Sequence, residues 1–132
     1  MIIGLPKEKR TDETRVALSP DNVKKLSKKG FRVLVERSAG ILAGFPDADY
    51  TSEGAELVDA KTAFSAEIIL KVNRPSDEEI SMMKRGTLLV CYVEPFNKNG
   101  FVEKLAAAGI DSMSVELIPR TSRAQSMDVL SS

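Results

Sequence analysis

The chain has 132 residues, of which 42% are apolar and 29% charged, with 19 basic residues, 19 acidic residues and no His. These values fit a single domain with a hydrophobic core, and the charge balance gives no general attraction to nucleic acid or to an anionic membrane. Without His, the sequence offers no His-based triad or general base, and no metal site is predicted.

The single cysteine, Cys91, lies in an apolar run over residues 88–93. This setting predicts a buried, unreactive thiol rather than a nucleophile. A lone Cys forms no internal disulfide, which suits a reducing compartment. No apolar run reaches the roughly 20 residues that span a bilayer, so no transmembrane segment is expected.

The first third of the chain predicts a strand–helix–strand unit. An apolar run over residues 1–5 predicts a buried strand, and a charged loop over 7–18 follows. A helix is predicted over residues 19–29, because a Ser-Pro-Asp sequence supplies an N-cap, a first-turn proline and a negative charge at the positive end of the helix dipole. Its four lysines predict a solvated face. Residues 31–36, rich in β-branched and aromatic side chains, predict the second strand.

The alternation of strand and helix continues to the end of the chain. Further helices are predicted over residues 47–53, 59–65, 76–85 and 100–108, and further strands over 55–58, 66–72, 87–93 and 110–115. Ser76 and Glu79 fit a capping box at the start of one of these helices. The pattern predicts an α/β fold with an open, mostly parallel sheet and helices on both faces, a Rossmann-like or flavodoxin-like three-layer domain. The glycine-rich dinucleotide fingerprint is absent.

Ligands of such sheets bind beyond the carboxyl ends of the strands. Two of the predicted loops there carry cations, of which Arg15 and Lys71 are the candidates for binding a carboxylate or phosphate. The other interpretation is that these cations pair with the nearby acidic residues Glu8, Glu13 or Glu94. Ion-pair networks are common, so spacing alone favours the structural interpretation without excluding the anion site.

Several stretches resemble the alanine dehydrogenase and nicotinamide nucleotide transhydrogenase family, and the resemblance covers the whole chain. They are residues 4–8, 13–17 with Pro20, Gly54-Ala55, 68–72 with Pro75, and the loop Pro119–Ser132. The final loop is similar to that of the NAD(H)-binding alpha subunit of proton-translocating NAD(P) transhydrogenase. In alanine dehydrogenases a catalytic His follows the strand equivalent to residues 87–93, and here Glu94 occupies that position.

The resemblance implies that Arg120, Gln125, Asp128 and Ser131 lie near the nicotinamide of NAD(H). Direct hydride transfer between two nicotinamides requires close, aligned rings and exclusion of water but no general acid or base, so no catalytic residue is expected.

In the family a Rossmann-type domain follows, so residues 1–132 are expected to be one N-terminal, substrate-side domain that stops at the start of a connecting helix. Tight NAD(H) binding by this chain alone is not expected. The implied partners are the missing Rossmann domain, the NADP(H)-binding and membrane components, and a second copy in a homodimer. The implied location is peripheral to a membrane complex, on its cytoplasmic or mitochondrial matrix side.

Two other functions stay open on the sequence alone. The chain could be the substrate domain of an alanine dehydrogenase-like enzyme, in which Arg15 and Lys71 clamp the carboxylate of a 2-oxo acid. It could also be a non-catalytic domain that acts only through association.

Overall fold

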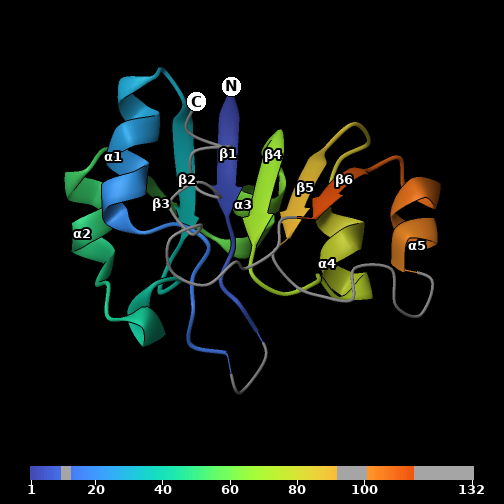
Figure 1. Ribbon diagram of the computed structural model, residues 1–132, viewed down its shortest axis with the longest axis horizontal. Coiled ribbons are helices and arrows are strands. Elements are labelled where there is room, and N and C mark those ends of the chain that lie inside the picture. Colours follow the sequence, from blue (N-terminus) through green and yellow to red (C-terminus); the bar gives the residue numbers. More distant parts are fainter. Residues whose placement is uncertain (10–12, 92–100, 115–132) are drawn as a thin grey trace.

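The computed structural model describes residues 1–9, 13–91 and 101–114, and the six strands found there form one parallel sheet. The strand order is β3-β2-β1-β4-β5-β6, and the strand arrows share one direction (Figure 1). The strands are β1 (Ile2–Leu5), β2 (Arg32–Glu36), β3 (Glu56–Val58), β4 (Ile68–Lys71), β5 (Leu88–Cys91) and β6 (Asp111–Ser114). The predicted α/β fold is confirmed.

Helices cover both faces of the sheet. Helices α1 (Pro20–Lys28) and α2 (Asp47–Ser52) bury Val23, Leu26 and Tyr50 against one face. Helices α3 (Ala60–Phe64), α4 (Asp77–Met82) and α5 (Phe101–Ala107) contribute Phe64, Ile80 and Leu105 to the core on the other. A 3-10 turn, η1 (Ile41–Ala43), lies between β2 and α2, where the sequence indicated a loop.

The central strand β1 is packed on both faces because successive side chains point to opposite sides. Ile3 and Leu5 belong to the core under α1 and α2. Gly4 faces α3, where a Cβ at this position would lie 2.1 Å from the carbonyl oxygen of Ala63. Glycine therefore allows α3 to approach the middle of the sheet closely.

The helix starts follow the predicted capping chemistry. The Ser19 hydroxyl accepts a hydrogen bond from the Asn22 N–H at 3.3 Å. Ser76 and Glu79 form the predicted capping box, with distances of 3.2 Å from Glu79 N to Ser76 Oγ and 2.9 Å from Ser76 N to Glu79 Oε1. Helix α4 ends at Met82 rather than at residue 85, because Met83 is extended and its buried side chain joins the core.

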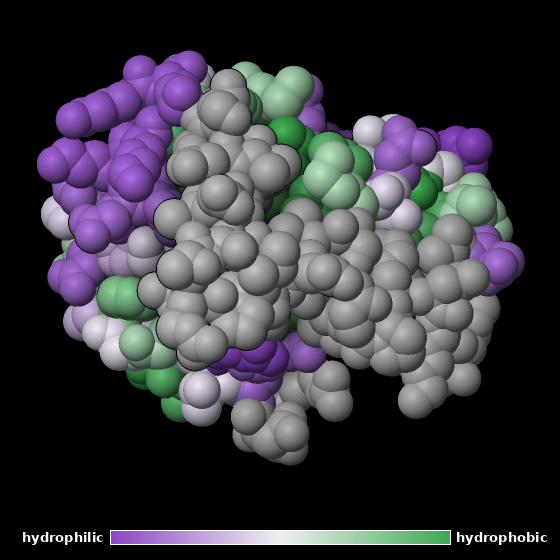
Figure 2. All heavy atoms as spheres, viewed as in Figure 1, coloured by the Kyte–Doolittle hydropathy of each residue, from purple (hydrophilic) through white to green (hydrophobic). Residues whose placement is uncertain are grey.

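The lysines of α1 form the solvated face that the sequence predicted. Lys24, Lys25, Lys28 and Lys29 are all exposed. Figure 2 shows hydrophilic side chains gathered at the upper left of the molecule, over the position of α1 in Figure 1. This face is explained by solvation and by favourable charge at the carboxyl end of the helix.

Candidate ligand site at the carboxyl edge of the sheet

The strand order reverses between β1 and β4, which lie side by side at the centre of the sheet. From β1 the chain proceeds to β2 on one side, and from β4 it proceeds to β5 on the other (Figure 1). The loops after the two strands therefore diverge. In open α/β sheets the crevice beyond such a switch point is where ligands bind.

Lys71 is the last residue of β4 and lies at this switch point with 1% of its surface exposed. Its Nζ is 3.2 Å from Glu8 Oε1 and 3.8 Å from Glu79 Oε1. A buried ammonium requires compensating negative charge, which these two carboxylates provide. Glu8 comes from the loop after β1 and Glu79 from α4, so Lys71 connects three segments.

The Glu8 carboxylate also binds the backbone at the end of β4. Its Oε2 accepts a hydrogen bond from Val72 N at 2.8 Å, and its Oε1 accepts one from Asn73 N at 3.1 Å. Charge-assisted bonds of this kind are stronger than neutral ones. Glu8 therefore fastens the loop after β1 to the loop after β4.

Asn73 extends the network toward the surface. Its Nδ2 donates to Glu13 Oε1 at 2.6 Å. Glu13 in turn accepts hydrogen bonds from Arg15 Nε and Nη2, both at 2.9 Å, and from Arg15 N at 2.8 Å. The side-chain bond from Arg15 is the main reason that the pKa of the Glu13 carboxyl is lowered from 4.5 to about 2, and the same bond raises the pKa of Arg15.

Two buried groups border this network. One oxygen of Glu79 serves the α4 cap, and the other, Oε2, is buried and has no hydrogen-bond partner among the described residues. Cys91 is fully buried, with its Sγ 3.9 Å from the Asn73 carbonyl oxygen. Burial raises the pKa of the Cys91 thiol to about 12, which agrees with the predicted unreactive thiol.

The structure brings both predicted cations, Arg15 and Lys71, to the carboxyl edge and shows what each contacts. Lys71 pairs with Glu8 and Arg15 pairs with Glu13, so the structural ion pairs expected as the alternative to an anion site are present. Lys71 is enclosed, whereas the Arg15 side chain is 55% exposed. The other predicted site residues, Arg120, Gln125, Asp128 and Ser131, lie outside the described residues, as does Glu94.

Sequence reasoning did not single out Asn73 or the second role of Glu79. Asn73 lies two residues after Lys71, so the period of a strand places both on one face. The sequence signal that could have found Asn73 is its spacing of two residues from Lys71, at the end of an apolar run. For Glu79 the capping-box pattern explained the residue as a helix cap and gave no sign of its contact with Lys71.

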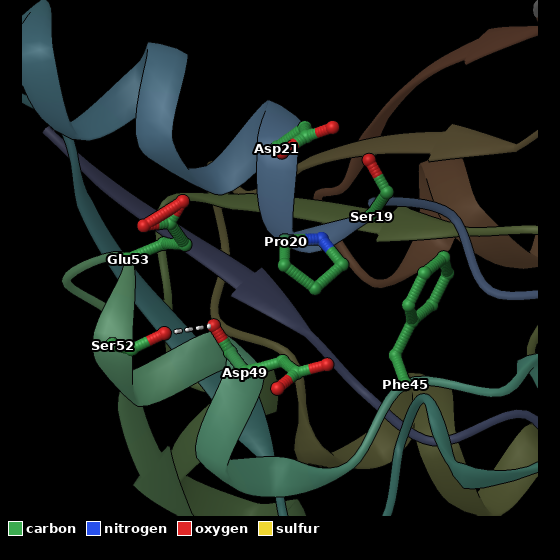
Figure 3. A pocket seen from close by; sticks show the side chains of 7 residues that line it. All are labelled: Ser19, Pro20, Asp21, Phe45, Asp49, Ser52 and Glu53. Carbon is green, nitrogen blue, oxygen red and sulfur yellow. Dashed lines mark hydrogen bonds between the residues drawn. The ribbon is translucent and has the colours of Figure 1, made fainter.

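A separate cavity of about 380 Å³ lies between the start of α1 and α2 (Figure 3). Its lining is acidic and apolar without a basic side chain, and consists of Ser19, Pro20, Asp21, Phe45, Asp49, Ser52 and Glu53. None of the predicted site residues lines it. Across the described part of the chain, no group of three or more potential ligand side chains could hold a metal ion.

Residues 4–132 match the family described as alanine dehydrogenase/PNT, N-terminal domain. The chain belongs to this family. It is 40% identical over 132 residues to the NAD(P) transhydrogenase subunit alpha of Haemophilus influenzae, covering all of this chain and 26% of that protein.

Two solved structures of family members have the same fold. The transhydrogenase of Sinorhizobium meliloti matches with a TM-score of 0.86 and 42% identity, over 98% of this chain and 39% of that one. An L-alanine dehydrogenase matches with a TM-score of 0.83 and 38% identity, over 93% of this chain and 34% of that one. The chain thus spans between about a quarter and two fifths of these relatives. Among the described residues, no helix has the length and apolar character needed to cross a membrane.

Proposed function

We propose that this chain is part of the NAD(H)-binding component of an NAD(P) transhydrogenase, which transfers hydride between NAD(H) and NADP(H). The similarity to transhydrogenase alpha subunits along the whole chain supports this assignment. In the proposal, residues 1–132 form the N-terminal domain of a longer subunit, and a Rossmann domain follows. The chain also offers no His to act as a general base.

The observation that carries the proposal is this similarity along the whole chain, and the groups at the carboxyl edge agree with it. The pKa of Glu13 is about 2 and that of Cys91 about 12, so neither exchanges a proton near neutral pH. Lys71 is buried between two carboxylates. Oxidation of an amino acid needs a base for the released proton, whereas hydride transfer between two nicotinamides needs alignment and dry surroundings.

The starts of the loops after β1 and β4 do not fit the diphosphate of NAD(H). After β1 the chain continues with Pro6, Lys7 and Glu8 instead of a glycine-rich turn. The Glu8 carboxylate accepts the N–H groups of Val72 and Asn73, so a second anion at these donors would be repelled. The proposal therefore assigns the diphosphate to the following Rossmann domain.

The proposal assigns the nicotinamide to the loop over residues 119–132. There Gln125 would hydrogen-bond the carboxamide, Arg120 and Asp128 would form an ion pair that fixes the loop, and Ser131 would approach the ring. In the complete complex the NADP(H)-binding and membrane components would be partners, with hydride transfer coupled to proton translocation. The subunit would be a homodimer on the cytoplasmic or mitochondrial matrix side of the membrane.

The test is hydride transfer from NADH to an oxidised nicotinamide analogue by the complete subunit mixed with the NADP(H)-binding component. Gln125→Ala and Asp128→Ala are expected to lower the rate about 100-fold, because misplacement of a ring by about 1 Å has an effect of that size. Asp111→Ala, an exposed substitution on β6, is the matched control and leaves the rate unchanged. Full activity in both loop variants would overturn the assignment.

The second candidate function is the substrate domain of an alanine dehydrogenase-like enzyme. The observation that favours it is the Arg15 side chain, which is more than half exposed at the edge where a 2-oxo acid would bind. Saturable pyruvate binding that Arg15→Ala abolishes would support it, and no binding at millimolar pyruvate would remove it. A subunit that binds neither nucleotide nor pyruvate but still forms a stable dimer would instead be an association domain.

A further inference from the structure

Arg15 is the outer end of a continuous network that begins at Lys71. From Lys71 Nζ the contacts pass to Glu8 Oε1 at 3.2 Å, and from that oxygen to Asn73 N at 3.1 Å. The amide of Asn73 contacts Glu13 at 2.6 Å, and Glu13 holds Arg15 through two side-chain bonds of 2.9 Å. Each residue of the network thus fixes the next.

Exposure changes abruptly at the last step of this network. The side chains of Lys71, Glu8 and Glu13 are 2%, 4% and 7% exposed, whereas that of Arg15 is 55% exposed. Buried charged groups that pair with one another resist movement, because any displacement would leave a charge unpaired in a low dielectric. The network therefore leads from buried side chains that hold one another in place to the exposed side chain of Arg15.

The bonds to Glu13 leave most of that guanidinium available. A guanidinium has five N–H groups. Glu13 receives one from Nε and one from Nη2, and the described residues supply no other side-chain partner. The position of the guanidinium is held by Glu13, and Glu13 is held in turn by Asn73.

We propose that Asn73 is a positioning residue, which orients Arg15 through Glu13 so that the guanidinium receives an acceptor oxygen of the bound nicotinamide nucleotide. This inference rests on the proposed function, since it takes NAD(H) as the ligand at this edge. The acceptor is the carboxamide oxygen of the nicotinamide, since the diphosphate is assigned to the following Rossmann domain. The accessible side of Arg15 is then a preorganised binding group rather than a surface charge.

A double-mutant cycle on the complete subunit tests the inference, with the Kd of NADH measured for wild type, Asn73→Ala, Arg15→Ala and the double variant. Arg15→Ala is expected to weaken binding about tenfold, as for loss of a charged hydrogen bond. Asn73→Ala is expected to weaken it severalfold in wild type but not in the Arg15→Ala background. The inference would be overturned if Asn73→Ala weakened NADH binding equally in both backgrounds, or if Arg15→Ala did not weaken it.

ADP-ribose, which lacks the nicotinamide, shows which part of the nucleotide Arg15 contacts. If Arg15→Ala weakens NADH and ADP-ribose equally, Arg15 does not contact the carboxamide and the inference is overturned. If it weakens NADH alone, Arg15 contacts the carboxamide. Asn22→Ala on α1, a residue outside the network, is the control and leaves both Kd values unchanged.

A ligand-free measurement keeps the inference testable if Asn73→Ala folds poorly or if the complete subunit does not bind NADH. Asn73→Asp preserves the shape but places a second carboxylate against Glu13. In the 132-residue chain, the Arg15 Nε–H is expected to be protected from hydrogen exchange and to lose this protection at least tenfold in Asn73→Asp. Unchanged protection would refute the positioning role. Wild-type protection without NADH binding would instead count against the proposed function.

Discussion

Charge pairing at the carboxyl edge dominates the behaviour of individual residues in this protein. Lys71 is almost fully buried, and among the described residues its ammonium is neutralised by the carboxylates of Glu8 and Glu79. Such a group cannot lose its partners or be removed alone without leaving charge buried. By contrast, Lys104 pairs with Asp77 at 3.2 Å on the surface, where water screens the interaction.

Replacement of Lys71 by Met should therefore be costly. Lys71→Met removes the cation that pairs with the buried carboxylates of Glu8 and Glu79, and we expect the free energy of unfolding to fall by about 3–5 kcal/mol. Lys104→Ala, which breaks the exposed pair, should cost less than about 1 kcal/mol. Urea denaturation of both variants measures the difference. Similar costs for the two would show that the Lys71 cluster does not contribute as its burial implies.

Acid should reveal the contribution of Glu13. Its folded-state pKa of about 2 is below the ordinary 4.5, so its stabilisation is present above pH 4.5 and is lost as the pH falls toward 2. Glu13→Gln lacks this titration. The gap in urea midpoint between wild type and Glu13→Gln should shrink from pH 6 to pH 3. A constant gap for Glu13→Gln would contradict the assigned pKa.

Single elements depend on their caps as well as on their packing. Helix α4 has only six residues, Asp77–Met82, too few for a helix that is stable in isolation. Its capping box satisfies N–H groups at its start, and the same Glu79 reaches Lys71. The cap therefore positions both the helix and one side of the buried charge cluster.

Loss of the α4 cap should be measurable. Ser76→Ala removes the acceptor for Glu79 N, and we expect the protein to lose about 1 kcal/mol of stability. Ser81→Ala, an exposed substitution near the end of the same helix, should change it by less than about 0.5 kcal/mol. Thermal denaturation of both variants decides the matter, and an equal effect would mean that the cap is dispensable.

For the whole molecule, the strand order determines where a ligand can bind. The reversal between β1 and β4 creates the edge where the loops diverge, yet Glu8 occupies the backbone donors at that edge. The N–H groups of Val72 and Asn73 are therefore not available to a diphosphate. The chain also spans no more than two fifths of the length of the related proteins named above.

Calorimetry can test whether the isolated chain binds NADH. NADH should bind the 132-residue chain with a Kd weaker than about 1 mM, or with no detectable heat, because too few contacts remain to offset the cost of association. Saturable binding at micromolar concentration would show that these residues suffice to hold the nucleotide.

Local sequence determined most of the elements. Apolar runs, Ser caps and glycine stops act over one or two turns, so the βα alternation, the capping box and the buried Cys91 followed directly from residue order. The short reach of these signals also explains the error at α4. Residues 83–85 continue a helical pattern, but the burial of Met83 in the core ends the helix earlier.

Only the tertiary structure decided which charges meet. The sequence marked Arg15 and Lys71 as cations at strand ends but left an anion site and ion pairs both open. Lys71 and Glu8 are 63 residues apart, and Asn73 and Glu13 are 60 apart. These pairs form because β1 lies next to β4 in the sheet, a consequence of how both faces are covered by helices. No local pattern contains that information, since strand neighbours depend on the packing of the whole domain.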